Sequence, residues 1–252
     1  MDTLADVVAA GRDREGPVVD APDRTADYTY AEFSTNAWKA GNLLRHYGVR
    51  PGATLSVVVG PKEPGPDDEP GWLGSAADPL VALLGGACLG AVVDLTPEQP
   101  VGGRAIVLPD AWLDRYEVEP GCSRLAYGGP PEVSGVAHFE RELWSENPIA
   151  PPGELAAEDP LLRVDGREYT HGEMLAAAQA VVDQQGLTAA DRVAIDAPLT
   201  TPGAVAAGVV APLAVGATIL LRTGATAPED VVYVVGDAST WGDRAVDPAT
   251  VP

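Results

Sequence analysis

Histidine and cysteine, which often carry acid–base, nucleophilic or metal chemistry, are sparse in this sequence. Its three histidines, His46, His138 and His171, lie far apart, and no cysteine or carboxylate–histidine spacing typical of a metal site accompanies them. The chain also lacks a GxSxG nucleophile elbow, an HExxH helix, a GxGxxG turn after a strand and a P-loop lysine. From motifs we therefore predict no catalytic residue, no cofactor-binding residue and no metal ligand.

The cysteines and the adjacent acidic residues give no stronger candidate. Cys88 lies in an apolar run and Cys122 in a loop flanked by proline and glycine, and neither belongs to a CxxC pair, so we expect neither a disulfide framework nor a metal site. The acidic pairs that begin at Asp67 and Glu158 are predicted to be solvated loop charges rather than an acid–base pair.

Three tryptophans stand in segments that we predict as loops or a short helix. Large aromatic side chains in such segments either complete the core or anchor a partner. For Trp72, Trp112 and Trp144 we favour the core.

Acidic residues dominate the charge of the 252-residue chain. It has 37 Asp and Glu against 16 Lys and Arg, which gives a net charge of -21, and only Lys39 and Lys62 are lysines. A surface of this charge repels the phosphate backbone, which argues against nucleic acid as a partner. Carboxylates at this density also repel one another until salt screens them, so the composition resembles that of proteins from a salt-rich, halophilic cytoplasm.

The N-terminal residues and the apolar segments predict a cytoplasmic protein without a membrane span. Residues 1–10 include acids and no basic region followed by a long apolar stretch, so we expect no signal peptide. Residues 197–221 are apolar and long enough to cross a bilayer. Because Pro202, Pro212 and Gly216 interrupt them, we expect a loop, a buried helix and a strand instead.

Two segments share a pattern that predicts equivalent elements. Each has Thr-x-x-Glu, at Thr29 and at Thr170, directly before apolar residues that recur every three or four positions. A threonine cap with a glutamate that reaches back to it forms a capping box, so both positions are predicted helix starts. Gly48 and Gly186 then predict the helix ends. Strands are expected directly afterwards, at 54–59 and 192–195.

The match extends upstream of these helices. Short strands beginning at Pro17 and Pro160 are each expected to turn back as a hairpin, the first through Pro22-Asp23 and the second through Asp165-Gly166. Each repeat therefore begins with a predicted hairpin.

The match extends downstream as well. Apolar helices led by Pro79 and Pro202 each end at a glycine before a further strand. The order hairpin, helix, strand, helix, strand thus occurs twice. It predicts an α/β protein of two pseudo-equivalent lobes, each a mostly parallel sheet covered by helices.

A proline-rich stretch, residues 147–153, is predicted to link the two lobes. We place the boundary there, so that residues 1–150 form the first lobe and residues 151–252 a second, shorter one. Residues 236–252 are expected to be a frayed tail. Three more elements are expected: strands at 105–108 and 231–235, and a short helix at 138–146.

A resemblance to AMP-forming acyl-CoA synthetases and other adenylate-forming ligases rests on three segments. Their T-Y-x-E-L motif resembles Tyr-Thr-Tyr-Ala-Glu-Phe at 28–33, and their K-A-G-A-x-x-V-P-x-x-P segment resembles Ala-Cys-Leu-Gly-Ala-Val-Val-Asp-Leu-Thr-Pro at 87–97. The part of these enzymes that follows their phosphate loop is similar to residues 170–221. The resemblance covers most of residues 21–221 and implies the α/β N-terminal domain of such a ligase.

The departures from the family concern its chemistry. Where active members have a Ser/Thr/Gly-rich phosphate loop ending in Pro-Lys-Gly, this chain has a plain predicted hairpin at 161–168. Lys62 follows a proline but lies in another loop. Arg163 and Arg167 are the only cations near the missing loop, and strand alternation predicts both on one face of the hairpin. The family's C-terminal domain, with its catalytic lysine, would lie beyond residue 252.

The resemblance and these departures imply a truncated, non-catalytic acyl-CoA synthetase-like protein without a cofactor. Such a pseudoenzyme would bind a small acyl-CoA-like or adenylate-like ligand between its lobes, or regulate or assemble with a complete synthetase or a second copy of itself. The alternative is half of a split synthetase that activates a carboxylic acid with ATP once a partner chain completes it. A third hypothesis is a structural module that binds nothing small, which a ligand-sized pocket would disfavour.

Overall fold

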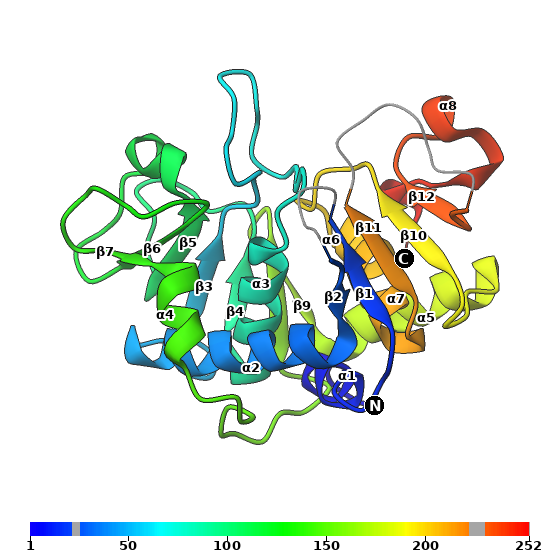
Figure 1. The fold of residues 1–252 in the computed structure, drawn as a ribbon, viewed down its shortest axis with the longest axis horizontal. Helices are drawn as coiled ribbons and strands as arrows, with labels where there is room; N and C mark the ends of the chain where they lie inside the picture. Colours follow the sequence, from blue (N-terminus) through cyan, green and yellow to red (C-terminus); the bar gives the residue numbers. More distant parts are fainter. Residues whose placement is uncertain (22–25, 222–229, 252) are drawn as a thin grey trace.

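Two sheets lie side by side with helices packed against them in the computed structural model, which describes residues 1–21, 26–221 and 230–251 (Figure 1). One sheet consists of β3 (Thr54–Val57), β4 (Val92–Asp94), β5 (Ala105–Pro109), β6 (Ser123–Tyr127), β7 (Val136–His138), β8 (Pro160–Val164) and β9 (Arg167–Thr170). The other consists of β1 (Pro17–Asp20), β2 (Tyr28–Thr29), β10 (Arg192–Ile195), β11 (Thr218–Leu221), β12 (Tyr233–Val235) and β13 (Ala245–Val246). The strand orders are β7-β6-β5-β3-β4-β8-β9 and β13-β12-β10-β11-β1-β2. The predicted α/β architecture with two mostly parallel sheets is confirmed.

Both predicted capping boxes are present. Thr29 caps α2 (Tyr30–His46): its Oγ1 accepts the Glu32 N–H at 3.2 Å, and Glu32 Oε2 accepts the Thr29 N–H at 3.1 Å. Thr170 caps α5 (His171–Gln185) in the same way through Glu173. Gly186 ends α5 with φ of 63°, the left-handed conformation that glycine adopts without strain. The local signals therefore set both helices.

The two helix–strand units occupy equivalent places in their sheets, as predicted. β3 lies between β4 and β5 and runs parallel to both. β10 lies between β11 and β12, again parallel to both. In each half, the strand that follows the capped helix therefore lies between the next two strands in the sequence.

The hairpin that begins each half, β1–β2 or β8–β9, pairs with a strand of the other half. β1, from the first half, pairs with β11 of the second, with Val19 opposite Ile219. β8, from the second half, pairs with β4 of the first, with Leu162 opposite Val93. A boundary at residue 150 therefore separates the sequence repeats but not the sheets, each of which takes strands from both sides of it. The predicted turn at Pro22-Asp23 lies outside the described residues.

The three short elements expected outside the repeats are all present, whereas the tail after residue 236 differs from its prediction. β5, β12 and the helix α4 (Phe139–Ser145) match their predictions. The expectation of a frayed tail after residue 236 is wrong. That segment forms α8 (Ala238–Trp241) and β13, which runs parallel to β12 with Val246 opposite Val235. The pairing partner, rather than the tail's own sequence, orders this strand.

The apolar segment 197–221 folds as predicted into a loop, a helix and a strand. The helix comprises α6 (Pro202–Val205), a π-helical stretch (Ala206–Val210) and α7 (Ala211–Val215), and it ends at Gly216, whose φ is 92°. No helix in residues 1–21, 26–221 and 230–251 is long and apolar enough to cross a membrane.

One apolar core joins the two halves. The helix α1 (Leu4–Gly11), which the sequence pattern did not reveal, packs against both α3 (Asp78–Leu89) and α7. The buried Tyr30 hydroxyl donates to the Ala217 carbonyl at 2.7 Å, and so links α2 to the turn before β11. Between the loops after the two central strands, the Leu199 N–H donates to the Gly71 carbonyl at 2.9 Å. The halves are therefore packed as a unit.

Candidate functional site

The hairpin at 160–170, where the sequence resemblance led us to expect a phosphate loop, has a two-residue turn. β8 and β9 are antiparallel, and Asp165 and Gly166 between them have φ of 49° and 76°. Positive φ at both central residues is typical of a type I′ hairpin turn. The predicted plain hairpin is confirmed.

One amide of the turn is already bonded within the protein. The Asp165 N–H donates to Thr96 Oγ1 at 2.9 Å, and the Thr96 N–H donates to Asp94 Oδ1 at 3.0 Å. A phosphate loop instead points its amides at the anion. Here the Asp165 amide already has a protein partner in the segment after β4.

The prediction that Arg163 and Arg167 share one face of the hairpin is wrong. In the antiparallel register Arg163 is opposite Glu168, and Arg167 is opposite Val164. Directly opposite residues project on the same side, and neighbours along a strand project on opposite sides. Since Val164 directly follows Arg163, the two arginines lie on opposite faces. The two-residue turn, which simple counting along the chain ignores, sets this register.

A cavity of about 560 Å³ lies beside the hairpin. It is lined by β3, by the end of β4 and the loop after it, and by the hairpin itself. Arg163 is the basic residue of its lining; the acidic ones are Asp94, Glu98, Asp165 and Glu168. The Arg163 guanidinium pairs with Glu168 Oε1 at 2.5 Å and also donates to Thr54 Oγ1 at 3.2 Å.

The electrostatics of this hairpin cavity disfavour an anion. Burial raises the pKa of Asp94, although the Thr96 amide and Arg163 act against that shift. With four carboxylates against one arginine that is already paired, the lining carries net negative charge at neutral pH. A triphosphate would be repelled here rather than held.

Lys62 lies at a second cavity, apart from the hairpin. Its Nζ is 3.2 Å from Oδ2 of the buried Asp78. Burial acts to lower the pKa of Lys62, but the Asp78 and Glu140 carboxylates outweigh it and raise that pKa. The lysine is therefore charged and paired with Asp78, and it does not line the cavity beside the hairpin.

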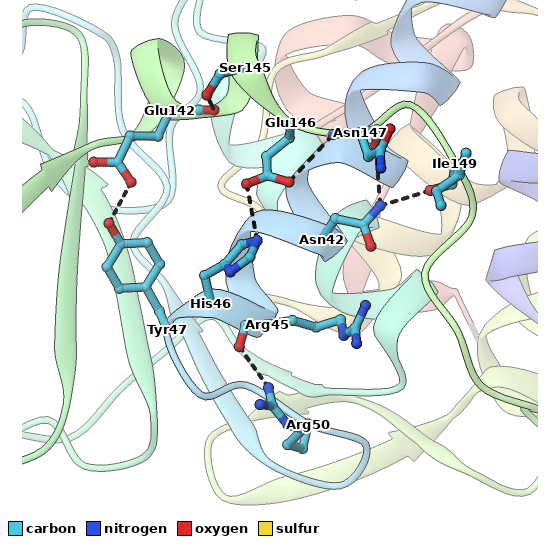
Figure 2. A network of polar contacts seen from close by, with 10 residues as sticks. All are labelled: Asn42, Arg45, His46, Tyr47, Arg50, Glu142, Ser145, Glu146, Asn147 and Ile149. Carbon is cyan, nitrogen blue, oxygen red and sulfur yellow. Dashed lines mark hydrogen bonds and ion pairs between the residues drawn. The ribbon is translucent and has the colours of Figure 1, made fainter.

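The three histidines lie apart, as the sequence predicts. His46 is exposed at the end of α2 with Nε2 3.3 Å from Glu146 Oε1 (Figure 2), and His138 Nε2 is 3.3 Å from Glu140 Oε2. Within residues 1–21, 26–221 and 230–251, no three His, Cys, Asp or Glu side chains are grouped as a metal site would require.

His171 is fully buried and joins α5 to the start of α1. Its Nδ1 accepts the Leu4 N–H at 3.1 Å, so the ring is neutral with the proton on Nε2, which has no partner in the part of the chain described. Burial lowers the pKa of His171, and the nearby Asp159 and Asp6 only partly offset that effect.

Protonation of His171 should therefore destabilise the fold. The unfolded chain takes up a proton near pH 6.5 while the folded chain resists it, so the free energy of unfolding should fall as the pH drops below about 6.5. The contribution is at most about 1.4 kcal/mol per pH unit. Urea unfolding across this range should show a shallower pH slope for His171→Asn, whose side-chain oxygen can still accept the Leu4 N–H. Equal slopes would contradict this role.

The tryptophans divide between core and surface. Trp112 is buried, as predicted, but Trp72 and Trp144 are 45% and 85% exposed, so the core prediction fails for these two. Sequence reasoning therefore missed Trp144 as a surface residue.

Cys88 is buried, which raises the pKa of its thiol to about 12, and Cys122 is half-buried.

Several solved structures share this fold. An anthranilate CoA ligase in complex with anthranoyl-AMP is 18% identical, covers 88% of this chain and 45% of its own, and gives a TM-score of 0.73. The benzoate CoA ligase from Burkholderia xenovorans LB400 is 19% identical over 89% of this chain and 46% of its own, with a TM-score of 0.67. The N-terminal domain of FACL13 from Mycobacterium tuberculosis is 17% identical, with a TM-score of 0.66 and coverage of 90% and 59%.

These comparisons define the fold as that of the N-terminal part of adenylate-forming ligases. No sequence family model matches the chain, and no curated protein matches it in sequence. The chain spans somewhat less than half the length of the two CoA ligases. The expected resemblance is thus confirmed at the level of the fold.

Proposed function

We propose that this chain is a non-catalytic relative of the acyl-CoA synthetases, with a binding, regulatory or assembly role. The observation that carries the proposal is the hairpin at the phosphate-loop position, where Arg163 is paired with Glu168 beside three further carboxylates. The turn amide of Asp165 is bonded to Thr96 and is not directed at a ligand.

The chemistry of adenylation explains why this matters. Attack of a carboxylate on ATP requires the triphosphate to be held and its developing negative charge to be stabilised. Losing one preorganised donor of this kind commonly costs about 3–4 kcal/mol of transition-state stabilisation. The hairpin cavity offers one arginine that is already neutralised, so we expect no measurable activation of carboxylic acids.

ATP–pyrophosphate exchange at high salt tests this expectation with acetate, fatty and aromatic acids as substrates. We expect no exchange above background at saturating substrate. The matched variant is Arg163→Ala/Arg167→Ala, which removes both cations of the hairpin. Exchange by the wild type that disappears in this variant would contradict the proposal and indicate a rebuilt phosphate site.

The alternative is a split synthetase, supported by the coverage of less than half of each CoA ligase. A partner chain would then have to supply the phosphate-holding groups that the hairpin lacks. Exchange assays on the protein purified together with its native partners distinguish the two. Activity in that complex, absent from the isolated chain, would favour the split enzyme.

A further inference from the structure

A second cavity of about 580 Å³ lies between the first turns of α2 and the helix α4, away from the hairpin. This α2–α4 cavity is within the size range of small-molecule sites. Its lining residues are Tyr28, Ala31, Glu32, Thr35, Asn36, Lys62, Asp78, Glu140, Leu143 and Trp144.

The walls of the α2–α4 cavity combine apolar and aromatic surface. Leu143 and Trp144 come from α4, and Tyr28 precedes α2. Trp144 already attracts one cation: Lys39 Nζ lies 5.7 Å from its ring centroid and donates to its carbonyl at 3.0 Å. Lys39 does not line the cavity. Aromatic faces of this kind favour ammonium groups.

The charges of the cavity are unbalanced towards the negative. The Asp78 side chain is more than nine-tenths buried. Its Oδ2 forms an ion pair with Lys62 Nζ at 3.2 Å. The angles of that contact are not those of a hydrogen bond, and within the described residues Oδ2 accepts no other hydrogen bond. Glu140 Oε1 accepts the Gly128 N–H at 2.7 Å. Glu32, whose Oε2 also accepts the Thr29 N–H, adds a third carboxylate to the lining. Lys62 is the single lysine or arginine of the lining, so a further positive charge would be stabilised.

The two walls of the cavity are held together by direct contacts within the chain. Figure 2 shows contacts between the end of α2 and the segment that contains α4 and follows it. The Tyr47 hydroxyl donates to Glu142, and Asn42 Nδ2 donates to the Ile149 carbonyl at 2.8 Å. Since these contacts fix α4 on α2 away from the cavity, the site is preformed and binding need not order it.

We propose that the α2–α4 cavity binds a small organic ammonium ion with an apolar or aromatic body. The ammonium would lie near Asp78 and Glu140, where Lys62 leaves negative charge uncompensated, and the body would pack on Leu143 and Trp144. A carboxylate ligand would instead be repelled by the three acidic side chains. This site is independent of the proposed loss of ATP chemistry at the hairpin.

Calorimetric titration of the intact protein with three ligands of similar shape tests the proposal. Benzylamine carries the ammonium, benzyl alcohol is neutral and benzoate is an anion. We expect saturable binding of benzylamine alone. Glu140→Gln should weaken it about tenfold, a loss typical of one partly buried charge pair. The exposed Trp144→Ala should weaken it about threefold.

The matched control is Glu132→Gln, which removes the same charge from an exposed residue outside the cavity lining and should leave the affinity unchanged. Melting temperatures establish that each variant is folded; if Glu140→Gln is not, Trp144→Ala decides. Equal affinity for benzyl alcohol or benzoate, no benzylamine binding at millimolar concentration, or equal weakening by Glu132→Gln and Glu140→Gln would overturn the proposal.

Discussion

Residues 1–150 and 151–252, produced separately, are expected to remain unfolded and to regain structure only when combined. Each fragment would carry a hairpin whose partner strand is in the other fragment. Val18, Val19, Leu161 and Leu162 are all nearly fully buried through these exchanged hairpins. Burial of one such side chain contributes about 1.5–3 kcal/mol. Each fragment would expose two of these four side chains, a loss of about 3–6 kcal/mol, which is a large part of the whole stability of a domain, about 5–15 kcal/mol.

Circular dichroism and urea unfolding of the two fragments, alone and mixed, measure this dependence. Residues 30–170 provide the matched control, because they contain α2 and every strand of the seven-stranded sheet. We expect this fragment to keep more cooperative structure than residues 1–150, despite similar length. Cooperative unfolding of isolated residues 1–150 with the stability of the whole chain would contradict the account.

The melting temperature of the whole chain is expected to rise steeply with KCl. A net charge of -21, with 37 acidic residues and two lysines, makes self-repulsion in the folded state large at low ionic strength. The screening length falls from about 30 Å at 0.01 M salt to about 3 Å at 1 M. Each kcal/mol gained should raise the melting temperature by about 2–4 °C.

Thermal melts in a KCl series separate screening from a general salt effect. Screening should saturate once the screening length is shorter than the spacing of surface charges. Sucrose, which stabilises folded proteins without screening charge, serves as the control. A melting temperature that does not change between low and molar KCl would contradict the predicted salt dependence.

Features set by neighbouring residues were predictable from the sequence. The Thr29 and Thr170 caps and the Gly186 stop each need only a few adjacent residues, and all three are present. The turn at Asp165-Gly166 is equally local. These signals sufficed for the order of elements within the two repeats and for the α/β fold class, but not for α1, β6, β7, α8 and β13.

Features set by distant pairing were not predictable. The exchange of the two hairpins depends on which strand β1 and β8 meet, and no local signal specifies that choice. Pairing with β12 likewise orders the tail strand β13. The α2–α4 cavity was missed because Asp78 and Glu140, far apart in sequence, meet there only in the folded chain. Trp144 gave the one sequence signal, as an aromatic in a short helix.

Direct binding of ATP with magnesium to the intact protein at high salt tests the central claim about the hairpin. Titration calorimetry needs no carboxylic acid substrate and no partner chain. Because Arg163 is paired with Glu168 and surrounded by carboxylates, we expect no saturable binding at millimolar ATP. Saturable binding that is lost in Arg163→Ala would show a functional phosphate site and contradict the account.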